Sequence, residues 1–219
     1  MDQKLVELLM QGCLETIYMT LVSTGIAYVL GIPLGVLVYA TDQKGIFPNK
    51  IVNTVLGFII NSIRSVPFLI LLVFILPLTR VIVGTTIGSN ATIVPLVVAA
   101  TPFVARMVEA SLREVDEGVI EAAKAMGCSK YQIVAKVLIP EAKPSLLSGM
   151  TIAIATILGY SAMAGFVGGG GLGAIAINYG YYRYQGGMMT ITVILLIVIV
   201  QIFQELGNRI VTKSDKRLK

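Results

Sequence analysis

Five segments of this 219-residue chain are apolar over lengths close to or above the roughly 17–25 residues that a helix needs to cross a bilayer. They lie at about 15–40, 52–77, 92–113, 146–167 and 188–207. Only 13% of the residues are charged, whereas soluble domains carry about 25%. A helix satisfies its own backbone hydrogen bonds in lipid, so each segment is expected to be a spanning helix. The sequence therefore predicts an all-α membrane protein with five transmembrane helices.

Lysine and arginine are distributed unevenly between the polar segments that separate these helices. If alternate loops lie on alternate sides of the membrane, thirteen of the 17 basic residues fall on one side and three on the other, with Arg64 inside a span. Basic loops are typically cytoplasmic. We therefore expect the N-terminus outside and the C-terminus in the cytoplasm, with residues 212–219 as a basic cytoplasmic tail that contacts anionic lipid. The net charge of +5 then requires no nucleic-acid partner.

The sequence offers little for catalysis or metal binding. The chain has no histidine, and the predicted topology puts its two cysteines, Cys13 and Cys128, on opposite faces of the membrane. We expect no catalytic residue, metal site or cofactor in this chain. It contains no G-x-x-x-x-G-K-[ST] phosphate loop and therefore cannot hydrolyse ATP by itself.

Two glycine patterns need a structural interpretation. Residues 168–173 match the dinucleotide pattern G-x-G-x-x-G, but they follow the outer end of a span instead of a strand. We expect a flexible or tightly turned external loop there. Gly31 and Gly35 match a helix-dimerisation pattern, which is weak evidence by itself.

The longest polar segment, residues 107–145, is patterned as two short helices. Asp116 is a suitable N-cap for a helix over about 116–127, and Gly127 is a suitable terminator. A second helix is expected from Lys130 to Val137, stopped by Pro140. In the first helix, small apolar residues recur at helical spacing: Val119, Ala122, Ala123 and Met126. Such a segment either lies on lipid or docks with a protein, and the narrow stripe and mixed charges favour a protein groove.

Arg64 is the one charge deep inside a predicted span. A helix entering the membrane near Val52 would carry it about 18 Å inward at 1.5 Å per residue. A charge at that depth is costly and is expected to face protein or water, so Arg64 either lines a path or stabilises the bundle. Alternatively, the span begins later and Arg64 lies near the cytoplasmic surface.

The segment Glu121-Ala122-Ala123, with Gly127 and Ile139-Pro140 at their spacings, resembles the EAA loop of type I ABC importer permeases. Further segments are similar to the methionine-uptake members of that family, and the resemblance runs over about 12–211, as one type I transmembrane domain. These segments are Arg64 to Phe68, Thr79 to Thr85, Pro102 to Glu109, Gly159 to Gly165 and Tyr179 to Tyr181.

The resemblance implies a non-catalytic permease subunit in the bacterial cytoplasmic (inner) membrane, which imports methionine, in D- and L-forms, by alternating access. Its implied partners are a second copy, two cytoplasmic ATPase subunits that bind ATP and magnesium, and an extracytoplasmic methionine-binding protein. The implied ATPase-docking residues are Glu121, Ala122, Ala123, Gly127 and Pro140. The candidate translocation path or gate adds Tyr160, Ser161 and Met163 to Arg64, although ordinary helix packing explains these three equally well.

Three alternatives to a methionine importer remain open from the residues. The first is an ABC permease for another amino acid. The second is a secondary transporter driven by an ion gradient, which is disfavoured because the spans lack a central acidic residue: Glu109 and Glu205 lie near cytoplasmic ends. The third is an intramembrane enzyme, which the missing histidine and acid pairs disfavour.

Overall fold

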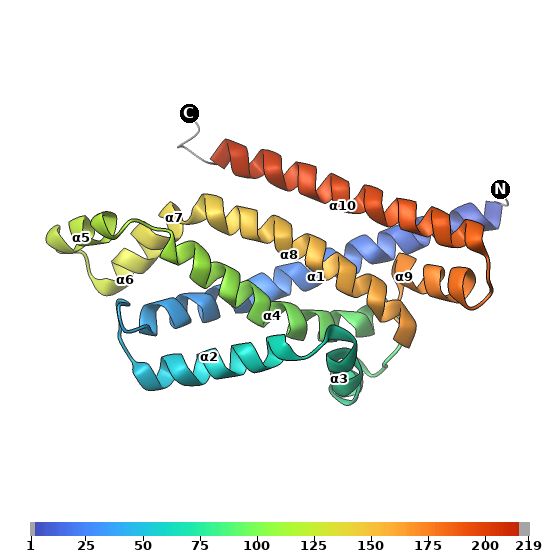
Figure 1. Ribbon diagram of the computed structural model, residues 1–219, viewed down its shortest axis with the longest axis horizontal. Helices are drawn as coiled ribbons and strands as arrows, with labels where there is room; N and C mark the ends of the chain where they lie inside the picture. The colour runs from blue at the N-terminus through green and yellow to red at the C-terminus, as the bar shows by residue number, and fades with distance from the viewer. Residues whose placement is uncertain (1–2, 215–219) are drawn as a thin grey trace.

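The computed structural model describes residues 3–214, which are mostly helical and contain no strand. Four long helices lie roughly along one axis: α1 (Gln3–Thr41), α4 (Ser89–Arg113), α8 (Lys143–Ala164) and α10 (Gly186–Ser214) (Figure 1). All four belong to segments long and apolar enough to cross a membrane. The all-α prediction is therefore confirmed. The first span begins earlier than predicted, at Gln3, and α10 continues into the predicted tail, of which residues 215–219 lie outside the described part.

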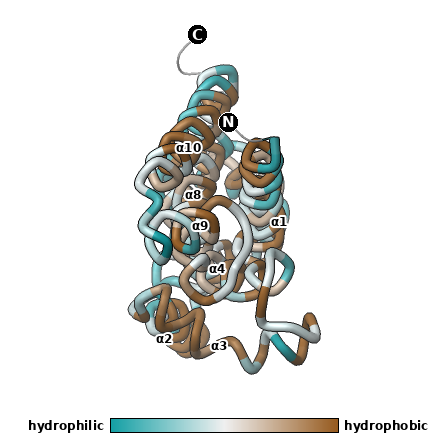
Figure 2. Tube along the Cα trace, turned by 90° about the vertical axis from the view of Figure 1, so that its right-hand side faces the viewer, coloured by the Kyte–Doolittle hydropathy of each residue, from teal (hydrophilic) through white to brown (hydrophobic). Residues whose placement is uncertain are grey.

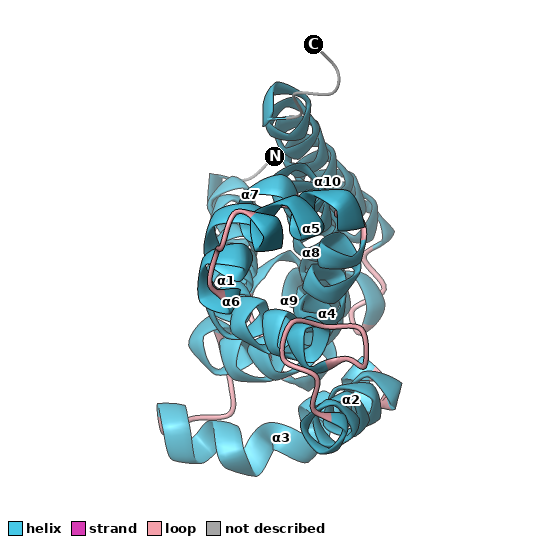
Figure 3. Ribbon diagram, turned by 90° about the vertical axis from the view of Figure 1, so that its left-hand side faces the viewer, coloured by secondary structure: helices cyan, strands magenta, loops and turns pink. Residues whose placement is uncertain are grey.

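The second predicted span is not one continuous helix. Residues 52–77 are divided between α2 (Lys50–Ser65) and α3 (Phe68–Val83), whose axes differ by 107°. Figure 3 shows α2 almost end-on while α3 runs across the view. Val66 has φ −81° and ψ 127°, the extended conformation that a following proline favours. The span predicted over 52–77 is therefore broken into two helices, and the bent pair provides the fifth candidate span when it is counted as one.

The centre of the bundle is the contact between α1 and α4. Added Cβ atoms at Gly31 and Gly35 would lie 2.6 Å from a Val104 methyl and 2.5 Å from the Ala105 carbonyl oxygen, so the two helices approach closely there. The glycine pair therefore packs within the chain, and its dimerisation pattern is used for an intramolecular contact. The core cluster around it continues along α4 through Leu96, Val104, Val108 and Leu112.

The outside of the bundle is also apolar. Large side chains are exposed along α2, α3 and α10, where the trace in Figure 2 is coloured mainly as hydrophobic, among them Phe58, Phe74, Val81, Ile197 and Ile202. Soluble monomers rarely expose such extended apolar surface. This distribution suits a surface covered by lipid and by other subunits.

The glycine-rich segment forms a tight, packed turn at the end of the bundle that also holds the start of α1 (Figure 1). It leads into α9 (Gly171–Ile175) and a π-helical segment, Ala176–Tyr181. The Glu15 carboxylate accepts a hydrogen bond from the Gly171 amide at 2.7 Å, and the Thr16 hydroxyl accepts one from the Leu172 amide at 2.9 Å. Of the two expectations for this loop, the tightly turned one is correct.

Candidate functional site

A short helix, α5 (Glu117–Ala125), stands at the opposite end of the bundle. Its N-cap is Asp116, whose carboxylate accepts a hydrogen bond from the Gly118 amide at 2.7 Å. Gly127, with φ +79°, turns the chain after it in a conformation that side chains disfavour. The helix predicted over 116–127 therefore forms, with the expected cap and terminator.

The second helical segment continues beyond its predicted end. It starts with a capping box between Ser129 and Gln132 and comprises α6 (Lys130–Gln132), the π-helical segment Ile133–Leu138 and α7 (Ile139–Glu141). The Ile139 amide donates to the Val134 carbonyl, five residues back. This wider turn accommodates Pro140, which has no amide hydrogen to contribute. The prediction that Pro140 stops the helix was wrong.

The two-helix segment is packed firmly onto the bundle. Ile120, Ile133 and Leu138 are buried in the same core cluster that runs along α4. The loop between α1 and α2 contacts the segment from another side through Phe47. The Phe47 ring centroid lies 5.3 Å from that of Tyr131, and the Lys130 ammonium lies over the Phe47 ring, 5.1 Å from its centroid. The segment is thus a fixed projection of the protein, as a docking element requires.

The five predicted docking residues do not all face outward. Glu121, Ala122, Gly127 and Pro140 are exposed, whereas Ala123 is only 1% exposed and packs against the bundle. The predicted small-residue stripe is therefore split. Its outer part is an exposed apolar strip made of Val119, Ala122 and Met126, and Met126 is 76% exposed. An apolar strip on a fixed helix is suited to cover by a partner surface.

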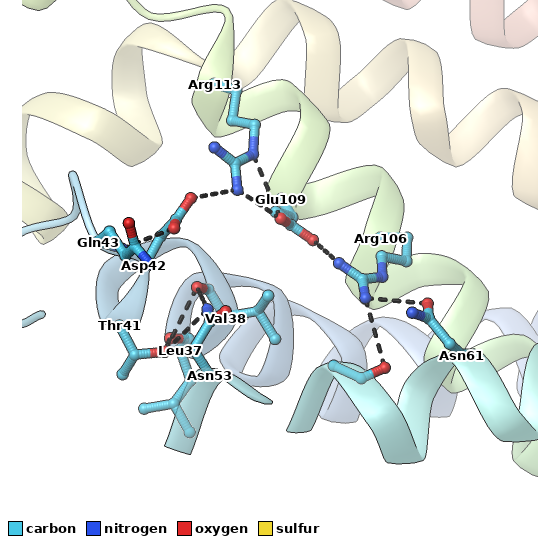
Figure 4. A network of polar contacts seen from close by, with 11 residues as sticks. Leu37, Val38, Thr41, Asp42, Gln43, Asn53, Asn61, Arg106, Glu109 and Arg113 are labelled. Carbon is cyan, nitrogen blue, oxygen red and sulfur yellow. Dashed lines mark hydrogen bonds and ion pairs between the residues drawn. The ribbon is translucent and has the colours of Figure 1, made fainter. Parts of the chain in front are cut away.

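A network of charged side chains connects this end of α4 to its neighbours (Figure 4). Glu109 is buried, and its carboxylate accepts from Arg106 on one oxygen and from Arg113 at 2.9 Å on the other. Arg106 also donates to the Asn61 side chain of α2 at 2.9 Å, and Arg113 pairs with Asp42 at 2.6 Å.

The network affects Asp42 electrostatically. The hydrogen bond from Arg113, with a second from the Gln43 amide, lowers the pKa of the Asp42 carboxyl below its ordinary value of 3.8. Sequence analysis missed the network, although Arg106, Glu109 and Arg113 recur at helical spacing. Among residues 3–214, no three acidic, cysteine or histidine side chains gather as a metal site.

The break between α2 and α3 brings together two of the predicted path residues. Arg64, in the last turn of α2, and Tyr160 of α8 line one cavity of about 250 Å³. The Tyr160 ring stacks on Phe68 of α3 with ring centroids 4.4 Å apart. Ser161 is buried and donates to the Leu158 carbonyl at 2.7 Å, while Met163 is 44% exposed. The structure therefore joins Arg64 with Tyr160 and leaves Ser161 in helix packing.

The sequence from 31 to 213 matches the family described as binding-protein-dependent transport system inner membrane component. This match covers well over half of the chain. The chain belongs to this family. It is therefore an inner-membrane permease component of a transport system that works with a binding protein, and not an enzyme in its own right.

Individual relatives cover nearly the whole permease. It is 49% identical to the probable D-methionine transport system permease protein MetI of Vibrio cholerae, and the match covers 96% of this chain and 94% of that protein. It is 44% identical to the methionine import system permease protein MetP of Bacillus subtilis, and this match covers 83% of the chain and 82% of that protein.

A solved structure of the inward-facing MetNI methionine ABC transporter is 48% identical, with a TM-score of 0.97, and covers 99% of this chain and 100% of that one. An amino acid ABC transporter with histidines is 22% identical with a TM-score of 0.80, covering 96% of this chain and 95% of that one, which shows a shared fold.

Proposed function

We propose that this permease imports methionine, in both D- and L-forms, across the bacterial inner membrane. The observation that carries the proposal is the similarity to methionine permeases over almost the full length of both chains. The proposed complex contains two copies of this chain, two cytoplasmic ATPase subunits that bind ATP and magnesium, and an extracytoplasmic methionine-binding protein. ATP binding and hydrolysis would drive alternating access of the path between the two permeases.

In this proposal α5 is the coupling helix that docks with the ATPase. Its support is physical: the helix is capped at Asp116, fixed on the core through Ile120 and Ala123, and exposes apolar side chains on its other side. A rigid element transmits a partner's movement better than a mobile loop. The orientation then follows the charge bias, with α5 and the end of α10 in the cytoplasm and the N-terminus outside.

The proposed function is tested by uptake into membrane vesicles that contain the permease, its ATPase and its binding protein. Uptake of labelled D- and L-methionine should require ATP inside the vesicle and persist when ionophores dissipate the proton and sodium gradients. The double variant Glu121→Ala/Gly127→Pro should abolish it with the permease still inserted, because proline cannot adopt the φ of +79° at position 127.

Uptake that follows an ion gradient without ATP would overturn the ABC importer mechanism. Uptake of another amino acid with no methionine uptake would keep the mechanism and overturn the substrate.

Docking is tested separately by co-purification of the ATPase with a tagged permease. Met126→Glu puts a charge on the exposed apolar strip and should weaken the association about tenfold or more, since an unpaired charge in an apolar contact costs at least about 1–3 kcal/mol. Ile87→Glu, at a side chain 67% exposed at the other end of the bundle, is the matched control and should leave association unchanged. Equal association of both variants would exclude α5 as the docking helix.

A further inference from the structure

The cavity at the helix break has walls from four separate helices. Arg64 comes from α2, Phe68 from α3, Ala99 and Phe103 from α4, and Tyr160 from α8. Its volume of about 250 Å³ lies just below the 300–1,000 Å³ typical of sites for drug-sized ligands. Because the walls belong to different helices, any rearrangement of the bundle changes the cavity. These features suit transient binding of a small metabolite.

One wall of the cavity carries a positive charge, from the exposed side chain of Arg64. The Arg64 guanidinium has no hydrogen-bond acceptor and no carboxylate partner among residues 3–214. An arginine within a membrane span costs at least about 2.5–3.5 kcal/mol unless water or an anion accompanies it.

The first turn of α3 begins at the same wall, after Pro67, and no side chain caps it. The amide hydrogens of a helix start lack intrahelical acceptors and add positive potential. Broken helices in other transporters use such ends to hold anionic substrate groups.

The other walls are aromatic. Phe68 and Tyr160 stack with an interplanar angle of 6°, and Phe103 lies on the same cavity from α4. Aromatic rings provide a large apolar contact, and their faces also attract an ammonium group. The cavity thus combines a site for a carboxylate with surfaces for an ammonium group and an uncharged side chain.

We propose that this cavity is a substrate site inside the permease for an α-amino acid with an apolar side chain. The substrate carboxylate binds the Arg64 guanidinium at the start of α3, and its side chain packs against Phe68, Phe103 and Tyr160. The inference rests on the proposed function, which it deepens by placing one step of recognition in the permease as well as in the binding protein. An anionic lipid head group shares the carboxylate's charge but not the apolar side chain that the small aromatic cavity accommodates.

The test is equilibrium binding of labelled methionine to the purified permease–ATPase complex without binding protein, with the isolated ATPase measured in parallel. Arg64→Ala should weaken binding by the permease at least about tenfold, the range expected for a charge-assisted pair. Arg64→Lys should have an intermediate effect, because lysine keeps the charge and loses the two-pronged geometry. Arg80→Ala is the control, since Arg80 lies on a different cavity of α3.

Methionine methyl ester tests the carboxylate contact directly. It should bind the wild-type complex at least tenfold more weakly than methionine, and Arg64→Ala should not weaken it further. Basal ATP hydrolysis and gel filtration establish that each variant complex is assembled, and Arg64→Gln replaces Arg64→Ala if the alanine variant does not assemble.

Vesicle uptake by the wild-type complex separates the two proposals. Methionine uptake together with binding that is indifferent to Arg64 would overturn the internal site and leave the proposed function standing. Absence of methionine uptake would overturn the proposed function itself. Displacement of an anionic lipid from Arg64 in place of methionine binding would identify a lipid site and also overturn the inference.

Discussion

At the scale of single residues, Glu109 is the charged side chain that is buried in the described structure. A buried carboxylate is strongly destabilising unless both oxygens are satisfied, and here two arginines of the same helix provide the partners. These arginines then reach outward, Arg106 to α2 and Arg113 to Asp42 in the loop after α1. Each link is a short charge-assisted contact, so the position of α4 is fixed against two neighbouring segments.

The Asp42–Arg113 pair gives a pH-dependent prediction. The pKa of Asp42 is lowered in the folded protein, so the pair contributes stability above the ordinary value of 3.8 and loses it as pH falls through the folded value. At pH 7 the melting temperature of the detergent-solubilised permease should be slightly higher than that of Asp42→Asn. The difference should be small, because Asp42 is partly exposed, and should vanish at strongly acidic pH. A difference that grows on acidification would contradict this account.

At the scale of helices, proline marks the limit of sequence-based prediction. Pro33, Pro77, Pro95 and Pro102 all lie inside continuous helices, whereas Pro67 lies at the break between α2 and α3, as the N-cap of α3. In a membrane helix, neighbouring groups can satisfy the carbonyl that a proline leaves free, so the local sequence does not distinguish a tolerated proline from a break. Hydropathy therefore located the spans, whereas the bend of α2 and α3 depends on packing against α4 and α8.

The proposed coupling helix, α5, shows the same limit for the candidate site. Its caps at Asp116 and Gly127 are local features, and both were predicted correctly. Whether Ala122 or Ala123 faces a partner depends on which side of a nine-residue helix meets the bundle, and the sequence of the helix alone does not determine this. The cavity at Arg64 was partly predictable, because a charge within a span is expected to face protein or water. Its aromatic walls were not predictable, because they come from three other helices.

The contact between the glycine-rich turn and α8 gives a prediction at this scale. Gly165 and Gly173 allow the backbone of α9 to approach the backbone at the end of α8. An added Cβ at Gly173 would lie 2.4 Å from the Ala162 carbonyl oxygen. Gly173→Ala should destabilise the permease by about 1–3 kcal/mol or more, because backbone atoms must move. Gly159→Ala on α8 is the control, since its Cβ meets nothing within 4 Å and alanine favours the helix. Thermal unfolding in detergent measures both, and equal melting temperatures would exclude the close contact.

At the scale of the whole molecule, the charged network connects the two candidate sites. It lies at the end of α4 that leads into α5, and it reaches α2 at Asn61, within one turn of Arg64. Movement imposed on α5 therefore has a direct route to the cavity at the end of α2, through side chains held by short polar contacts. This arrangement suits a subunit whose transport step is driven from outside the membrane.

Arg106→Gln tests that route. The substitution removes the link from Glu109 to Asn61, while Arg113 still pairs with Glu109 and limits the loss of stability. We expect the complex to assemble and hydrolyse ATP but to transport several-fold less methionine for each ATP hydrolysed, because α2 no longer follows α4. The matched control is Arg209→Gln, which breaks an exposed pair with Glu205 on α10, of the kind that contributes little. Uptake and hydrolysis measured in the same vesicles give the ratio. If both variants keep the wild-type ratio, the network stabilises the fold without transmitting movement of α5.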